Sequence, residues 1–239
     1  MHAGKRKAPC IKVGDYERSI LDLLGFLVAY DAAKNEEARG KVLTRAWRQL
    51  WATPQWFVDG LAELAGVSFD LDLCAEAATA KAPLWFGPGS PVMIHGPGEE
   101  IRPAVDAFEA MPWRYYLGGS HTAAWFNPPF LQMQRWVNGI LGETCGRMWR
   151  AIGVSPSSTD RPWFGQLLRH HRTHMTTVEG ERLRFEPPPG VKPSSPGGGV
   201  VVWSVGFDAS PFGAVLTLAE VREAADRAQR RKLGRGVKA

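Results

Sequence analysis

Ala123-Ala124-Trp125-Phe126-Asn127-Pro128-Pro129-Phe130 is the stretch of sequence that decides the fold. Its first four residues are apolar, as in a buried strand, whereas proline cannot donate a hydrogen bond to a sheet ladder. We therefore expect a strand that ends abruptly at Asn127. Apolar residues at helical spacing follow over 136–141, and Gly142 ends that pattern. A buried strand followed by a helix is the repeating unit of a parallel sheet.

The same alternation continues upstream of this stretch. Thr53-Pro54 predicts a helix start, with the Thr53 hydroxyl as the cap and Pro54 in the first helical position. Gly66 is the expected end of that helix. Residues 67–74 then form a short apolar run that ends in acids, which is typical of a buried strand.

Downstream, residues 148–154 predict a third strand, and Asp160 begins a capped helix. More short strands are expected with no helix between them, at 175–178, 183–185 and 200–205, with a Pro/Gly/Ser loop over 186–199. We therefore predict an α/β, Rossmann-like fold with a mostly parallel sheet and an antiparallel edge strand.

Three parts of the chain are expected from these patterns. Residues 1–50 form a helical N-terminal extension, with one helix over 15–33 and a second that Asn35 caps. Residues 51–212 form the central domain, and residues 213–239 form a basic C-terminal helix or tail. The arginines of this last part favour either a solvated helix face or an arm that contacts nucleic-acid phosphates.

Composition excludes several classes of protein. The chain of 239 residues has 29 Lys and Arg against 24 Asp and Glu, a net charge of +5 that mildly favours a polyanionic partner. Its three cysteines form no CxxC pair, which argues against a disulfide or zinc-ribbon scaffold and favours a reducing cytoplasm. The sequence contains no run of about 18 apolar residues, so it predicts no membrane span.

The end of the Asn127 strand also carries chemistry. An amide oxygen and a backbone carbonyl, at Asn127 and Pro128, can together accept both protons of an exocyclic amine. Such acceptors stabilise the positive charge that develops when the amine nitrogen attacks. Phe130 offers a flat face on which a base can stack. The alternative is a proline-rich strand exit with a buried phenylalanine.

Five blocks occur in one order: Thr53-Pro54-Gln55-Trp56, Leu71-Asp72-Leu73-Cys74-Ala75, Trp125 to Phe130, Thr159 to Phe164, and Gly180 to Phe185. From about Thr53 to Phe207, this series resembles the phage-encoded DNA N-6-adenine methyltransferase family. The resemblance implies an S-adenosylmethionine-dependent enzyme that methylates the N6 amine of a flipped adenine in double-stranded DNA. It also implies no metal, and a DNA-methylation or restriction-modification role in a bacterial cytoplasm, with phage or prophage origin.

Individual residues match the family's motifs. Asn127, Pro128, Pro129 and Phe130 match its catalytic motif. The resemblance places a cofactor-binding set at Thr53, Pro54, Asp72, Cys74 and Asp160, in which Asp72 flanks the methionine part and the helix start at Thr53 lies over the same pocket. Cys74 also fits a small core residue better than a nucleophile.

The sequence departs from the family in two places. No glycine-rich turn follows Asp72, and residues 87–119 are longer than expected, which makes them a candidate target-recognition or lid insertion, or else a surface insertion with no specific role. Candidate DNA-contacting residues are Arg102, Arg114, Tyr115, Tyr116, His121, Arg182 and Arg184.

Other functions remain open at this point. The Asn127–Phe130 motif would recognise only an amino group, so methylation of RNA or of a protein glutamine is an alternative. The missing glycine turn favours a second alternative, a catalytically idle DNA-binding relative. His170 and His174 have helical spacing but no acidic partner motif, so we interpret them as exposed basic residues rather than metal ligands.

Overall fold

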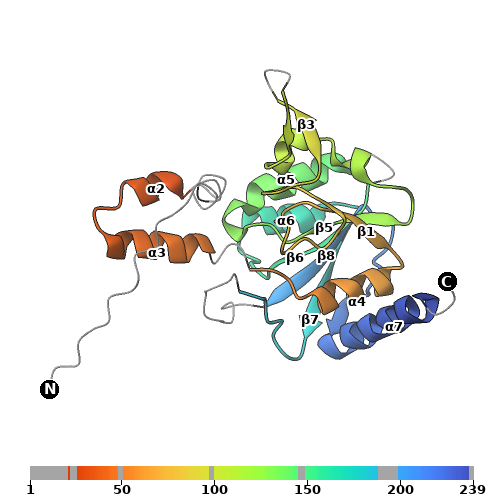
Figure 1. The fold of residues 1–239 in the computed structure, drawn as a ribbon. Helices are drawn as coiled ribbons and strands as arrows, with labels where there is room; N and C mark the ends of the chain where they lie inside the picture. The colour runs from red at the N-terminus through yellow and green to blue at the C-terminus, as the bar shows by residue number, and fades with distance from the viewer. Residues whose placement is uncertain are drawn as a thin grey trace. The chain divides into compact units, whose positions relative to one another are not determined.

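The computed structural model describes residues 21, 26–47, 51–96, 100–144, 149–187 and 199–236 (Figure 1). The chain divides into two units, Met1–Arg48 and Gln49–Ala239. The first unit contains α2 (Leu27–Asp31) and α3 (Glu36–Trp47). Asn35 Oδ1 accepts a hydrogen bond from the Ala38 N–H at 2.9 Å, so the predicted cap of α3 is confirmed. The helix expected over 15–33 lies largely outside the described residues. Of that range the structure describes residues 21 and 26–33, which contain α2.

A seven-stranded sheet of order β2-β1-β5-β6-β8-β7-β9 forms the centre of the second unit. Its strands are β1 (Ser68–Asp72), β2 (Leu84–Trp85), β5 (Thr122–Phe126), β6 (Ala151–Pro156), β7 (Thr173–Glu179), β8 (Val200–Val205) and β9 (Val215–Thr217). In the described part of this sheet, neighbouring strands are parallel except where β8 pairs with β6 and β7. The prediction of an α/β fold with a mostly parallel sheet is confirmed.

The prediction of an antiparallel edge strand is wrong. β8 lies inside the sheet between β6 and β7, while β9, which is parallel to β7, forms the edge. All six residues of β8 are buried, and a strand with two covered faces gains from a hydrogen-bonding partner on each side. Residues 183–185 form no strand: this segment makes a single isolated bridge, Glu186 with Ala52.

Helices cover both faces of the sheet (Figure 1). On one face α4 (Gln55–Ala65) packs against α7 (Leu218–Gly236), and on the other lie α5 (Met133–Glu143) and α6 (Pro162–Arg169). The alternation of side chains in β5 separates two cores, because Phe126 points into the α5–α6 core and Trp125 into the α4–α7 core. Within the described ranges, no helix is both long and apolar enough to span a membrane.

Two predicted helix starts are shifted. α4 begins at Gln55, with Pro54 in the N-cap position in an extended conformation (ψ 137°), so the Thr53 hydroxyl lies one residue too early to cap it. α6 begins at Pro162 with Arg161 as N-cap, and Asp160 does not cap it. The expected end of α4 is confirmed, because Gly66 adopts the left-handed conformation (φ 63°) that closes a helix.

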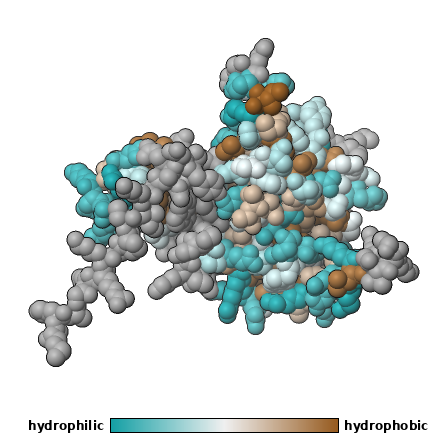
Figure 2. All heavy atoms as spheres, viewed as in Figure 1, coloured by the Kyte–Doolittle hydropathy of each residue, from teal (hydrophilic) through white to brown (hydrophobic). Residues whose placement is uncertain are grey.

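The long segment before β5 is folded onto α5. It contains the antiparallel hairpin β3 (Met93–His95) and β4 (Ile101–Pro103), then η1 (Ala107–Ala110) and η2 (Trp113–Tyr116). The carboxylate of Glu143 at the end of α5, which is only 2% exposed, accepts hydrogen bonds from the Trp113 N–H at 3.0 Å and from Arg114 Nη1 at 3.2 Å. The hairpin projects from the helices, and its surface is partly hydrophobic (Figures 1 and 2).

Removing the charge of Glu143 should loosen this attachment. We expect Glu143→Gln to lower the free energy of unfolding by roughly 1–3 kcal/mol, because Trp113 and Arg114 donate to different carboxylate oxygens and glutamine replaces one of these oxygens by an NH2 group that cannot accept. Urea denaturation measures the change. The matched control is Glu109→Gln, which removes the exposed partner of Arg102 and should cost about 0–1 kcal/mol. Equal losses in the two variants would contradict the structural role of Glu143.

Candidate functional site

The order of strands reverses between β1 and β5. β2 follows β1 in the chain and lies on one side of it, whereas β5 lies on the other side. In open α/β sheets, ligands bind at such a switch point, outside the carboxyl ends of the strands. Asp72 pairs with Trp125 in the register, so the last residues of β1 and β5 are neighbours. The topology therefore brings Asp72 and the Asn127–Phe130 motif to one candidate site.

Asn127 is oriented by a backbone carbonyl. Its Nδ2 donates a hydrogen bond to the Trp51 oxygen at 2.9 Å. A carbonyl oxygen can only accept, so the nitrogen side of the amide must face Trp51 and Oδ1 must lie on the opposite side. No described residue donates a hydrogen bond to Oδ1, and Asn127 is only half-buried. The strand end thus presents an acceptor oxygen that a ligand can reach.

The rest of the motif forms a rigid turn into α5. Pro128 and Pro129 are buried, and Phe130 begins η3 (Phe130–Gln132). The Gln132 N–H donates to the Pro129 carbonyl at 3.0 Å, which closes the turn. Phe130 is half-buried and packs against the α5–α6 core.

Asp72 organises the loop between β1 and β2. Oδ1 accepts from the Cys74 N–H at 3.1 Å and Oδ2 from the Lys81 N–H at 3.0 Å. Burial raises the pKa of this carboxyl to about 6, although the two backbone hydrogen bonds oppose the shift. Residues 73–83 form turns rather than a helix, so Asp72 fixes the path of a short loop at the site. Burial also raises the pKa of the Cys74 thiol, which keeps it protonated at neutral pH.

The raised pKa of Asp72 predicts a pH dependence of stability. The folded protein binds the Asp72 proton more tightly than the unfolded chain does, so the contribution of this group to stability falls as pH rises from about 4 to 6. We expect the free energy of unfolding of the wild type, relative to Asp72→Asn, to fall by roughly 2–3 kcal/mol between pH 4 and pH 7. Urea denaturation across this range measures the difference. A difference that stays flat or rises would contradict the assignment.

The segment Trp51-Ala52-Thr53 lies beside Asn127 and carries unmatched polar atoms. Thr53 is 1% exposed, yet Thr53 Oγ1 and Trp51 Nε1 make no hydrogen bond within the described part of the chain. A buried polar atom without a partner costs free energy, so native structures rarely leave one. These two atoms are therefore candidates for contact with a bound group.

The other predicted cofactor residue, Asp160, follows the carboxyl end of β6. Its side chain is exposed and lies 3.6 Å from the Arg161 guanidinium. It shares the sheet edge with Asp72 and Asn127 but makes no described contact with either. Among the described residues, no group of three or more His, Cys, Asp and Glu could hold a metal ion.

The candidate DNA-contacting residues are spread over the second unit. Arg102 is paired with Glu109 at 3.1 Å and lies 3.6 Å from Glu100. Arg114 is paired with Glu143 and lies over the exposed ring of Tyr115. Both arginines of the insertion therefore have their charge balanced inside the chain.

Four further candidates are Tyr116, His121, Arg182 and Arg184. Tyr116, which is still within the insertion, packs edge-on against Phe86, next to the loop that Asp72 fixes. His121 precedes β5 and so lies at the opposite, amino edge of the sheet from Asn127. Arg182 and Arg184 are exposed on either side of the buried Leu183, in the segment that bridges to Ala52. Among the seven candidates, only these two arginines lie in the described segment that bridges to Ala52.

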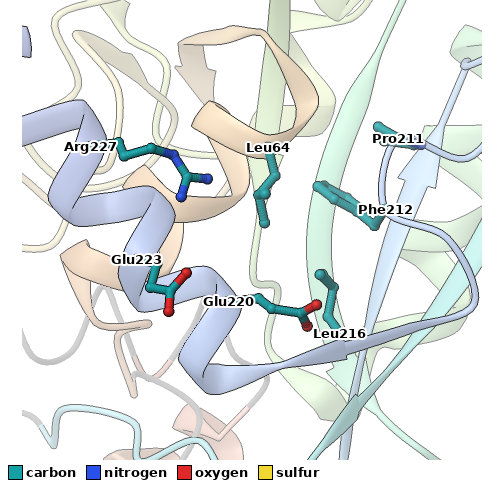
Figure 3. Close-up of a pocket in the computed structure, with 7 residues that line it drawn as sticks. All are labelled: Leu64, Pro211, Phe212, Leu216, Glu220, Glu223 and Arg227. Atoms are coloured by element: carbon teal, nitrogen blue, oxygen red, sulfur yellow. The ribbon is translucent and has the colours of Figure 1, made fainter.

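A pocket of about 250 Å³ opens between α4, β9 and α7 (Figure 3). Its lining combines apolar side chains with two carboxylates and a guanidinium: Leu64, Pro211, Phe212, Leu216, Glu220, Glu223 and Arg227. Leu64 is at the end of α4, whereas residues 51–53 precede its start, so this pocket is remote from Asn127. Glu220 accepts from the Thr217 N–H at 2.7 Å and thereby caps α7.

Sequence reasoning missed the roles of Trp51 and Glu186. Trp51 contacts Asn127 through its backbone carbonyl, and Glu186 bridges to Ala52 through its backbone N–H and carbonyl. Backbone atoms carry no residue-specific signal, so no motif could mark them. In comparisons with known proteins, neither a family model nor a curated protein matches this chain.

Proposed function

We propose that the chain is a Rossmann-like, S-adenosylmethionine-dependent methyltransferase that methylates the N6 amine of adenine in DNA. The observation that carries the proposal is the placement of Asn127. Within the described part of the chain nothing donates to its Oδ1, which lies at the carboxyl end of β5, at the point where the strand order reverses. The order of motifs that resembles the DNA adenine methyltransferases supports the same function.

Asn127 and Pro128 would act on the amino group of the target base. Oδ1 and the Pro128 carbonyl would each accept one amine proton, which frees the nitrogen lone pair from the ring and stabilises the positive charge of the transition state. Phe130 would stack on the base after it has left the duplex. Positioning and charge stabilisation suffice for an in-line transfer to such an amine.

The residues around Asn127 fit a cofactor in part. S-adenosylmethionine would supply the methyl group: its carbon–sulfur bond would break as the carbon–nitrogen bond forms, S-adenosylhomocysteine would leave, and the methylated nitrogen would lose one proton to water. The buried Thr53 hydroxyl and Trp51 indole N–H, both without partners among the described residues, would bind its polar groups, and the start of α4 suits a carboxylate. Asp72 has both oxygens occupied by backbone N–H groups, so it would shape the cofactor loop over 73–83 rather than bind directly.

One observation favours a substrate other than duplex DNA. The two arginines of the insertion, Arg102 and Arg114, are balanced by carboxylates, which leaves fewer free cations to contact phosphates. An amino-methyltransferase acting on a protein glutamine needs no such contacts. This is the second candidate function.

A methyl-transfer assay tests the proposal. Purified full chain with labelled S-adenosylmethionine is offered unmethylated duplex DNA, RNA of the same sequence and an unfolded protein, singly and in competition. We expect label in DNA, recovered as N6-methyldeoxyadenosine after digestion. Label in protein would establish the second candidate instead. Absence of any cofactor binding by calorimetry would support the catalytically idle relative, and cofactor binding with no transfer to any of the three substrates would also overturn the proposed reaction.

Arg182 and Arg184 are the predicted phosphate contacts. We expect the double variant Arg182→Ala/Arg184→Ala to weaken DNA binding and to reduce the slope of log K against log salt by about 0.9 for each phosphate interaction that the substitutions remove. Fluorescence anisotropy with a labelled duplex measures both quantities. Arg169→Ala, at the exposed last position of α6, is the matched control. An unchanged slope in the double variant would exclude these arginines from the interface.

A further inference from the structure

We infer that residues 51–53 form a positioning strap that selects one orientation of the Asn127 amide, and that the bridge to Glu186 holds this strap in place. The inference rests on the proposed function, because it assigns the strap a part in the same reaction. Trp51 and Glu186 are positioning residues: they act through Asn127 and through backbone atoms.

The strap is fixed at the Glu186 end by a pair of backbone hydrogen bonds. The Ala52 N–H donates to the Glu186 carbonyl at 3.0 Å, and the Glu186 N–H donates to the Ala52 carbonyl at 2.8 Å. Just before Glu186 in the chain, Leu183 and Phe185 are buried in the α4–α7 core. The strap is therefore attached to the packed interior through a segment more than 130 residues away in sequence.

The start of α4 fixes the other end of the strap. Thr53 is buried, and the Pro54 carbonyl accepts from the Phe57 N–H at 3.0 Å and the Val58 N–H at 3.3 Å in the first turn. The helix packs very close to α7: Gly60 leaves no room for a side chain, since an added Cβ would overlap the backbone of Val221. Both ends of the strap thus rest on packed elements, and the Trp51 carbonyl is held 2.9 Å from Asn127 Nδ2.

A fixed carbonyl matters because an asparagine amide has two faces. Rotation by about 180° about its last torsion exchanges the oxygen and the NH2 group. With Oδ1 toward the substrate, Asn127 accepts a hydrogen bond from the amine; with NH2 there, it presents two donors to a group that is itself a donor. The strap excludes the second orientation, because a flipped amide would set its oxygen against the Trp51 oxygen. Loss of the strap should lower kcat at saturating cofactor and leave KM for the substrate unchanged, while cofactor binding can weaken because Trp51 and Thr53 belong to the proposed cofactor site.

The test uses a pair of variants at one exposed position. Glu186→Pro removes the N–H that donates to Ala52, whereas Glu186→Ala keeps it and removes only the side chain. We expect kcat of Glu186→Pro at saturating cofactor to fall about 10- to 100-fold, with KM for the substrate unchanged, and Glu186→Ala to match the wild type. A parallel fall of kcat in both variants, or a change confined to KM, would overturn the inference.

A second measurement is independent of activity. In the wild type, the Asn127 side-chain NH2 signal, identified by its loss in Asn127→Ala, should exchange with solvent at least about 10-fold more slowly than the exposed Asn138 NH2. In Glu186→Pro the two rates should converge. Equal rates in the wild type would overturn the positioning role. Absence of methyl transfer in the wild type with a protected amide would overturn the proposed function and leave the strap standing.

Discussion

Replacing Asn127 with aspartate should reduce methyl transfer about 10²- to 10³-fold, although the two side chains have nearly the same size. An aspartate carboxylate has no N–H to donate, so it cannot keep the hydrogen bond to the Trp51 carbonyl. One of its oxygens would lie against that carbonyl and be repelled. The carboxylate would turn away, and the acceptor would leave the position that the amine requires. Single-turnover methylation with saturating labelled cofactor measures the loss.

Two further variants sharpen this prediction. Asn127→Ala removes the acceptor altogether and should lose transfer to a similar extent, whereas cofactor binding by calorimetry should persist in both Asn127 variants. Asn138→Ala is the matched control, because Asn138 is an exposed asparagine on α5 whose Oδ1 accepts from Gln134 and Gln166. Full activity of Asn127→Asp would show that the hydrogen bond to Trp51 is not needed to place the acceptor oxygen. Full activity of Asn127→Ala would show that residue 127 does not supply the acceptor and would remove the main support for the proposed function.

The order of elements could be predicted from sequence because each depends on a local pattern. Residues 200–205 form β8 as predicted, since six consecutive residues without a charge suit a fully buried strand. The place of β8 inside the sheet could not be predicted in this way. The place of β8 depends on which other strands have unpaired backbone N–H and C=O groups along an edge, and this is a property of the whole sheet. β9 has only three residues, too few for a recognisable period.

Residues 183–185 show the converse limit of pattern reading. Buried and exposed side chains alternate there as in a strand, but the segment packs Leu183 and Phe185 into the core and pairs through one bridge alone. Alternation reports which side chains are buried, and it does not report whether a neighbouring strand is present. The segment instead holds the strap over Asn127.

The candidate site, like the fold, could be predicted from the sequence only in part. Asn127 was predictable because two prolines fix the end of its strand, and a strand end in a parallel sheet faces the ligand crevice. The pairing of Arg102 and Arg114 with carboxylates could not be predicted. Their carboxylate partners Glu109 and Glu143 are seven and 29 residues away, and only the fold brings them into contact. A formal charge in the sequence therefore does not show whether that charge is free to meet a phosphate.

Gly153→Ala should destabilise the second unit by about 3 kcal/mol and also impair the site. Gly153 of β6 pairs with Phe126 of β5, and an added Cβ would overlap both the carbonyl oxygen and the ring of Phe126. Both residues are buried, so the strand end has no room to relax without moving Asn127, the next residue. Moving a catalytic group by about 1 Å can reduce the rate about 100-fold. Urea denaturation followed by tryptophan fluorescence, together with the methylation assay, measures the two losses.

The matched control for this substitution is Gly142→Ala in α5. An added Cβ at Gly142 meets nothing within 4 Å, and alanine is a better helix former than glycine by about 1 kcal/mol. Gly142→Ala should therefore leave activity unchanged and keep or raise stability. If Gly153→Ala behaves like this control, the close contact between β5 and β6 is not what holds the Asn127 strand end. If stability falls and transfer persists, Asn127 keeps its position by the Trp51 contact alone, and the strap is sufficient to orient the amide without support from the sheet.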